Sequence, residues 1–211
     1  MSEELLSIPV ENGAISLEGL FEEGRTGRNA ILCHPHPLFG GNMDNNVIQA
    51  ARKAFASLGW GTLRYNFRGA GESGGNPAEG QKDAVDLIAI SELLRNKSTA
   101  GIDIAGYSYG AWAAMEAIRM GLRPDSLILL APPLDFISFE GLELPDAPAL
   151  IIVGDRDEYC SIKSLQNWLS KRPKTKLPAL EVLKGADHFF WGAEPQLTAK
   201  IGVFVKTLKG I

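Results

Sequence analysis

Short apolar runs alternate with longer segments of helical period along most of the chain. The short runs predict buried strands at residues 30–33, 61–67, 101–105, 126–131, 149–153 and 179–183. Repeated strand–helix–strand units favour a mostly parallel sheet with helices on both faces. Between the strands, apolar residues recur every three or four positions, as in helices that cover a sheet: Val47, Ala51, Phe55 and Leu58; Ala84, Leu87, Ile88, Ser91 and Leu94; Leu197, Ile201, Phe204 and Leu208.

The N-terminal segment has a different pattern. Two apolar-rich runs, 5–10 and 14–21, flank Glu11-Asn12-Gly13, and Asn-Gly is the favoured chemistry of a tight hairpin turn. We therefore expect an antiparallel hairpin ahead of the parallel strands, in an α/β fold with a twisted sheet of about eight strands. No internal repeat, low-complexity tract or linker divides residues 1–211, so a single domain is expected.

Composition and charge exclude several classes of protein. Of 211 residues, 45% are hydrophobic and 22% charged, which is typical of a folded globular chain and not of a disordered one. The net charge of -4 argues against a nucleic-acid partner, and the most basic stretch, 171–176, is typical of a solvated loop. No signal peptide and no run of 18 apolar residues is found, so we expect a cytoplasmic protein without a membrane partner.

The two cysteines do not indicate a metal site. Cys33 and Cys160 are far apart in the sequence and have no metal-ligand companions at short spacing. Cys33 lies in an apolar run and is expected to pack in the core, whereas Cys160 falls in a loop and is expected to be partly reactive. We expect neither a metal nor a cofactor.

The stretch Gly106-Tyr107-Ser108-Tyr109-Gly110 carries the strongest chemical signal. It follows the predicted strand 101–105 and precedes the helix-like segment 111–120. A serine on a sharp turn between a strand and a helix is the layout of a nucleophile elbow, in which flanking glycines leave room for strained backbone. Because the pentapeptide alone can arise by chance, the hypothesis depends on its partners.

Candidate partners follow other predicted strands. Ligands of a parallel sheet bind beyond the carboxyl ends of its strands, and the segments there contain Asp157 and His188 as well as Ser108. Their chain order, Ser then Asp then His, is that of a serine hydrolase built on this sheet. Activating a serine hydroxyl requires a base with a pKa near neutrality, and His188 is the expected general base.

The whole arrangement resembles the α/β-hydrolase superfamily. Two stretches, residues 34–41 (HPHPLFGG) and 64–73 (RYNFRGAGES), are similar to small bacterial hydrolases related to the dienelactone-hydrolase and prolyl-oligopeptidase-like branches. Dienelactone hydrolases carry a cysteine nucleophile, whereas this chain has Ser108. The resemblance therefore implies acyl transfer through a seryl ester.

Three carboxylates compete to orient the histidine. Asp157 is favoured, because it lies a few positions past the strand 149–153, where the backbone has turned over the sheet edge. Asp155 is interpreted as a turn residue that bonds its own backbone, and Asp135 stays a minor alternative. Asp187, next to the base, is expected to shape its turn.

The loop 34–41 is the expected source of an oxyanion-hole donor. Proline has no N–H, so between Pro35 and Pro37 only the His36 amide can donate. We therefore expect the backbone amides of Tyr109 and His36 to form the oxyanion hole, with the Leu38 amide in reserve.

A glycine-rich stretch, 69–74 (GAGESG), also matches the dinucleotide-binding fingerprint and follows a strand. This interpretation fails on context, because Gly75-Asn76-Pro77 continues the loop where a helix should already have begun. The neighbouring Arg68 is expected to order this loop and not to bind substrate.

The expected substrate is a small acyl ester or thioester. Residues 134–148 are too few for a cap, which predicts an open site. Aromatic residues in the edge loops are candidates for substrate binding, core sealing or a subunit contact: Phe39, Phe136, Phe139, Tyr159, Phe189, Phe190 and Trp191, of which Phe39, Phe136, Tyr159 and Phe189 are the chosen substrate-binding set. A peptidase or amidase of the same fold and a catalytically silent binding protein stay open, and the protein is expected to be a monomer or a homodimer.

Overall fold

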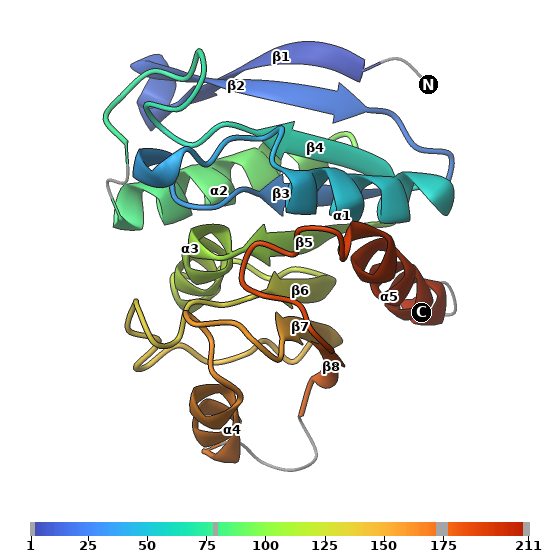
Figure 1. Cartoon of the computed structure of the whole chain (residues 1–211). Helices are drawn as coiled ribbons and strands as arrows, with labels where there is room; N and C mark the ends of the chain where they lie inside the picture. The colour runs from blue at the N-terminus through green and yellow to red at the C-terminus, as the bar shows by residue number, and fades with distance from the viewer. Residues whose placement is uncertain (1–2, 78–79, 172–176, 209–211) are drawn as a thin grey trace.

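Eight strands of the described chain form one sheet in the order β1-β2-β4-β3-β5-β6-β7-β8 (Figure 1). The computed structural model describes residues 3–77, 80–171 and 177–208. Only β2 runs antiparallel to its neighbours, and all other adjacent pairs are parallel. The predicted sheet and its N-terminal antiparallel pair are thus confirmed. The strands are β1 Glu3–Val10, β2 Ile15–Glu22, β3 Arg28–Cys33, β4 Gly61–Tyr65, β5 Gly101–Tyr107, β6 Ser126–Leu130, β7 Ala149–Gly154 and β8 Ala179–Leu183.

Helices cover both faces of the sheet, as predicted. On one face α1 (Asn46–Ser57) and α5 (Glu194–Thr207) lie side by side and bury apolar residues such as Val47 and Leu197 against the strands. On the other face α2 (Gln81–Arg95) and α3 (Tyr109–Arg119) do the same, and α4 (Ile162–Ser170) adds Leu165 to their core. The predicted apolar positions lie in these two cores.

Some boundaries differ from the sequence-based prediction. The strand β4 ends at Tyr65, two residues earlier than predicted, while β5 continues to Tyr107. The helix α4 was not predicted, although Ile162, Leu165, Trp168 and Leu169 recur at helical spacing and pack against the core. The predicted hairpin turn is a wider connection over residues 11–14, in which Glu11, Asn12 and Gly13 all have positive φ.

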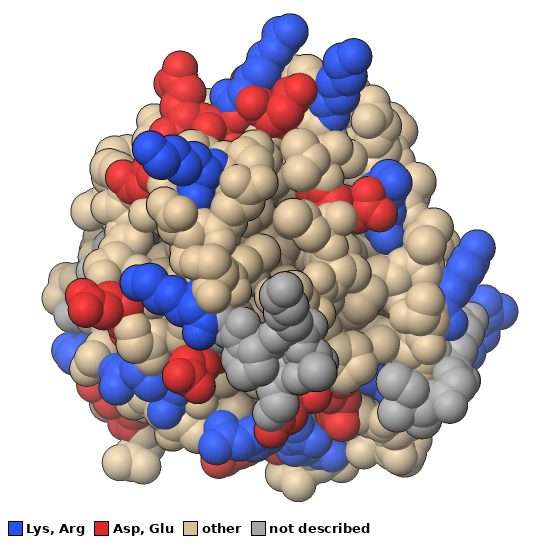
Figure 2. Space-filling model, turned by 90° about the horizontal axis from the view of Figure 1, so that it is seen from below, with Lys and Arg blue, Asp and Glu red and all other residues tan. Residues whose placement is uncertain are grey.

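The surface bears on two expectations, the absence of a large basic patch and the absence of a membrane-spanning helix. Figure 2 shows lysine, arginine and carboxylate side chains of both signs interspersed over the face it draws. Of the basic stretch 171–176, all but Lys171 lies outside the described residues. Within the described ranges, no helix combines the length and the apolar character needed to cross a bilayer.

The loop after β4 is held by a buried arginine. The Arg68 guanidinium, 1% exposed, donates to both carboxylate oxygens of Asp86 on α2 at 2.6 and 2.8 Å and to Glu11 at 3.2 Å. A charge that is removed from water needs such paired hydrogen bonds. Arg68 therefore orders this loop, as its sequence position predicted.

Replacing Arg68 by Ala should lower the free energy of unfolding by about 3–5 kcal/mol, because Asp86 is left as a buried charge without this partner. Urea unfolding followed by circular dichroism measures the change. The matched control is Lys200→Ala, which breaks the exposed Lys200–Glu181 pair of 2.8 Å and should cost less than about 1 kcal/mol. Losses of similar size in the two variants would contradict the structural role of Arg68.

Candidate active site

Ser108 occupies a one-residue turn between β5 and α3. The strand ends at Tyr107, the helix begins at Tyr109, and Ser108 has φ 53° and ψ -117°. A non-glycine residue rarely adopts this conformation, which persists only where the surroundings enforce it. The flanking glycines are required sterically: a Cβ on Gly106 would lie 2.4 Å from the Gly110 carbonyl oxygen, and one on Gly110 would lie 2.2 Å from that of Cys33.

Ser108, His188 and Asp157 form a continuous hydrogen-bonded relay. The Ser108 Oγ lies 2.9 Å from His188 Nε2, and His188 Nδ1 lies 3.0 Å from each carboxylate oxygen of Asp157. With a proton on Nδ1, the imidazole donates to the carboxylate and Nε2 accepts from the serine hydroxyl. Both His188 and Asp157 are buried, and the backbone amides of Tyr159 and Cys160 donate to the carboxylate at 2.8 and 2.9 Å.

Two side chains that the sequence analysis missed hold the loop of His188. The buried Tyr107 hydroxyl donates to the His188 carbonyl at 3.0 Å, and burial raises the pKa of this phenol, so it stays a donor. On α1, the Asn46 side-chain amide donates to the Phe189 carbonyl at 3.0 Å. Tyr107 lies inside the pentapeptide motif, which was its one available signal; for Asn46 the sequence offers none.

The competing carboxylates are used elsewhere. Asp155 accepts from the Gly185 amide at 2.6 Å, so it braces the neighbouring loop and does not bond its own backbone as predicted. Asp135 accepts from the Ser161 amide at 2.6 Å at the start of α4, and Asp187 accepts from the Phe189 amide, shaping the turn as expected. Among these four aspartates of the described chain, Asp157 is the one that is hydrogen-bonded to His188.

The loop after β3 brings His36 beside the elbow. The His36 and Tyr109 rings are in contact, with centroids 4.7 Å apart. The His36 Nδ1 accepts from the Leu38 amide at 3.2 Å and so caps the short helix η2 (Pro37–Phe39). The Leu38 amide, the reserve oxyanion donor, is therefore already used in a hydrogen bond within the loop. Among the described residues, the backbone amides of His36 and Tyr109 have no hydrogen-bond partner.

His34 has a different task from the other two histidines. Its ring is fully buried; Nδ1 donates to the Pro35 carbonyl at 2.6 Å, and Nε2 accepts from the Phe67 amide at 2.9 Å. Burial lowers the pKa of His34 to about 4, against an ordinary 6.5. A neutral His34 thus ties the loop after β3 to the end of β4.

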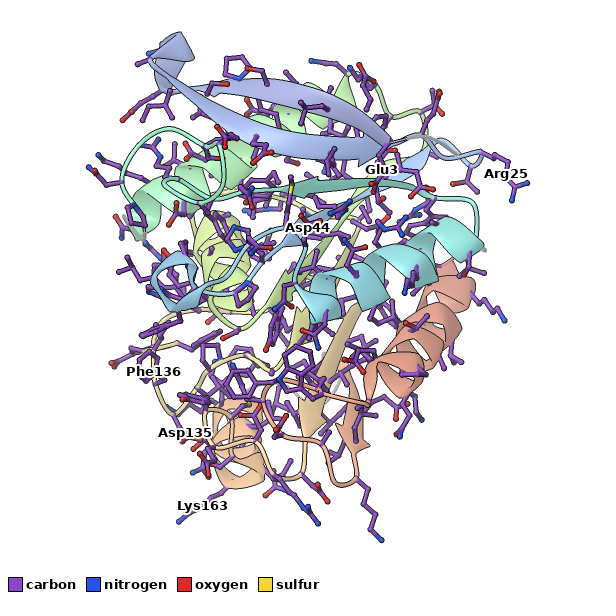
Figure 3. The ribbon with its side chains drawn as sticks, turned by 45° about the horizontal axis from the view of Figure 1, so that its top comes forward. Glu3, Arg25, Asp44, Asp135, Phe136 and Lys163 are labelled. Carbon is purple, nitrogen blue, oxygen red and sulfur yellow. The ribbon has the colours of Figure 1, made fainter. Side chains whose placement is uncertain are left out.

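Four exposed rings form a chain of contacts that reaches His188 through two of its members, and we call them the aromatic rim: Phe39, Phe136, Tyr159 and Phe189. Neighbouring rings are 6.3, 5.8 and 6.5 Å apart in that order, and each comes from a different loop. Figure 3 labels Phe136 beside Asp135, on the loop that follows β6 and lies near α4. The other three aromatic candidates divide differently: Phe139 and Phe190 are buried in the core, whereas Trp191 is exposed.

Known proteins share this architecture. A protein of Rickettsia prowazekii (strain Madrid E), the uncharacterized protein RP471, is 33% identical over 188 residues, which are 85% of this chain and 79% of that protein. The structure of an α/β serine hydrolase homologue from Coxiella burnetii is 30% identical, with a TM-score of 0.83 and 96% of each chain covered. XC6422 of Xanthomonas campestris, described as an α/β serine hydrolase without a lid, is 29% identical, with a TM-score of 0.89 and 98% and 95% covered.

The chain belongs to the lidless α/β hydrolases. No family model matches it. The segment 134–148 of this hydrolase contains no helix or strand, so it forms only a loop, as predicted. A hollow of about 630 Å³ is lined by residues that include Phe139, Leu144 and Trp168, but not by Ser108 or His188.

The structure also bears on the two cysteines and on metal binding by this hydrolase. Cys160 is buried, and burial followed by the nearby Asp157 raises the pKa of its thiol, so the prediction of a partly reactive loop cysteine was wrong. Cys33 is buried as expected, with its thiol pKa raised to about 12. Within the described ranges, no three His, Cys, Asp or Glu side chains are arranged to hold a metal ion.

The glycine-rich loop 69–74 of the hydrolase does not present its amides to a phosphate. Those of Gly69, Ala70, Ser73 and Gly74 donate to backbone carbonyls, and that of Glu72 donates to the Glu18 carboxylate. The next helix, α2, begins only at Gln81. A dinucleotide site needs free amides at the start of a helix, and this loop lacks that geometry.

The neutral His34 predicts a pH-dependent stability. Its pKa is about 4 folded and 6.5 ordinarily, so between these values the unfolded chain binds more protons and stability falls as the pH falls. Between pH 6.5 and 4, the unfolding free energy of the wild type should fall relative to His34→Gln by about 1.4 kcal/mol per pH unit. Urea unfolding across this range measures the slope, and parallel pH profiles would contradict the assignment.

Proposed function

We propose that this protein is a serine hydrolase that cleaves small carboxylic esters or thioesters through an acyl-enzyme on Ser108. The observation that carries the proposal is the relay in which Ser108 Oγ lies 2.9 Å from His188 Nε2 and His188 Nδ1 lies 3.0 Å from Asp157. A serine hydroxyl is a weak nucleophile until such a base accepts its proton. Membership of the lidless α/β hydrolases supports a hydrolase; the ester chemistry and the residue roles are our proposal.

In the proposed first half-reaction, Ser108 attacks the carbonyl carbon of the ester while His188 Nε2 takes the hydroxyl proton. Asp157 holds the imidazole in the tautomer that can accept this proton and stabilises the imidazolium that forms. The backbone amides of Tyr109 and His36 donate to the oxyanion. The tetrahedral intermediate collapses as Nε2 returns the proton to the leaving alcohol or thiol.

In the second half-reaction, His188 takes a proton from a water molecule, and the resulting hydroxide attacks the seryl ester. Collapse of the second tetrahedral intermediate releases the carboxylic acid and restores the Ser108 hydroxyl. Neither half-reaction requires a metal or a cofactor. Because no lid covers the serine, small or exposed acyl groups can reach it, and the aromatic rim supplies apolar contacts for the substrate.

An organophosphonate probe should label Ser108 in the native protein. The His188→Ala variant should lose most of this labelling, because the hydroxyl then keeps its proton. Intact-protein mass spectrometry measures the mass added, with Ser108→Ala as the blank and urea unfolding as the check that His188→Ala folds. A native, folded protein that stays unlabelled would refute the proposed function.

The oxyanion role of the His36 amide can be separated from its side chain. His36→Pro removes the N–H and should lower kcat by about 100-fold. His36→Asn is the matched control, because it keeps the amide and its side-chain oxygen can accept the Leu38 N–H that His36 Nδ1 accepts now. Kinetics on an aryl acetate measure both variants, and losses of equal size would defeat the amide assignment.

A further inference from the structure

The aromatic rim places exposed apolar surface beside His188. Phe39, Phe136 and Phe189 are 75%, 58% and 48% exposed, and Tyr159 is 36% exposed. Large side chains of this kind normally contribute to the core, and a contiguous exposed group of them is typical of a binding surface. The position of each ring relative to His188 therefore indicates which part of a substrate it can contact.

The rim is not distributed evenly about the relay. Tyr159 and Phe189 both contact the imidazole of His188, with ring centroids 4.7 and 5.6 Å from it. Phe136 contacts Tyr159 at 5.8 Å and so extends this side. Phe39, at the other end, contacts His36 at 4.9 Å, on the side of the proposed oxyanion donors.

The reaction distinguishes these two sides. The leaving oxygen or sulfur must receive its proton from His188 Nε2, so the leaving group lies against the imidazole when the tetrahedral intermediate collapses. The buried Tyr107 ring also contacts this imidazole, but only an exposed ring that does so, such as Tyr159 or Phe189, can meet a substrate that arrives from solvent. By this geometry, Tyr159 and Phe189 flank the alcohol or thiol part of the substrate.

We propose that Tyr159 and Phe189, extended by Phe136, bind an aromatic ring in the leaving alcohol or thiol, so that the preferred substrates are aryl-alkyl esters such as benzyl-type esters. This inference rests on the proposed function of Ser108. The inference adds that the site selects its substrates by the leaving alcohol or thiol.

The shape of the site favours an aromatic ring over an alkyl chain. Pairs of rim rings meet at steep angles, 85° for Phe136 with Tyr159 and 80° for Tyr159 with Phe189, so they offer both edges and faces. An aromatic ring gains edge-to-face and offset contacts with such rings beyond the gain from apolar area alone.

Two pairs of substrates test the inference. Benzyl acetate and cyclohexylmethyl acetate have leaving alcohols of similar basicity and size, so their chemical reactivity is matched. Methyl phenylacetate and methyl cyclohexylacetate make the same comparison on the acyl side. We expect kcat/KM to favour benzyl acetate over its cyclohexyl partner by about 5- to 10-fold, whereas the two methyl esters should differ by less than about twofold.

Leucine substitutions locate the selectivity. Tyr159→Leu and Phe189→Leu keep an apolar side chain and keep the backbone groups that bind Asp157 and Asn46, yet remove the rings. Each should lower the benzyl preference, measured as the ratio of kcat/KM for benzyl acetate to that for cyclohexylmethyl acetate, to below about twofold. The matched control is Trp191→Leu, an exposed ring in the same loop that contacts none of the rim rings in the described structure; it should keep the full preference.

The outcomes are distinguishable from those that test the proposed function. Turnover of both acetates at equal kcat/KM, a benzyl preference that survives in the rim variants, or a preference found only on the acyl side would overturn this inference and leave Ser108 as nucleophile. Both rim variants should still be labelled at Ser108 by the phosphonate, which shows that they fold and keep the nucleophile. If native protein is neither labelled nor active on any of the four esters, the proposed function and this inference both fail.

Discussion

The geometry of the site depends on backbone segments that approach one another too closely for any side chain to fit between them. A Cβ on Gly110 would lie 2.2 Å from the carbonyl oxygen of Cys33, so the first turn of α3 rests directly on the end of β3. A Cβ on Gly154 would lie 2.2 Å from the carbonyl oxygen of Ala186, so the end of β7 rests on the loop that carries His188. The first contact sets the elbow against the end of β3, and the second sets the end of β7, which precedes Asp157, against the loop of His188.

Buried polar groups then orient what the close packing brings together. The Tyr107 hydroxyl, one residue before Ser108, donates to the carbonyl of His188, so the strand that leads to Ser108 also holds the loop of His188. Asp157 in turn accepts two backbone amides besides the imidazole. A carboxylate with several donors has little freedom to rotate, which keeps the imidazole in the tautomer that can accept a proton.

Much of this could be predicted from the sequence, because the sheet imposes a regular pattern. Buried parallel strands appear as short apolar runs, and the residues that follow them meet at one edge whatever the details of packing, so Ser108 and His188 could be chosen. The partners of Asp155 and Asp135, and the burial of Cys160, could not be predicted, because they depend on which loops touch. The helix α4 could have been predicted as well, because Ile162, Leu165, Trp168 and Leu169 recur at helical spacing.

Aromatic residues show why loop function is hard to read from composition. Phe189 and Phe190 are adjacent and chemically identical, yet Phe189 is 48% exposed beside His188, while Phe190 is fully buried in the core against α1 and α5. The backbone of Phe190 has a φ of 54°, a left-handed conformation that breaks the alternation of an extended chain. The turn therefore anchors the Phe190 ring in the core and leaves the Phe189 ring beside His188. That anchor lets an exposed ring keep a defined position next to His188 without being part of the core.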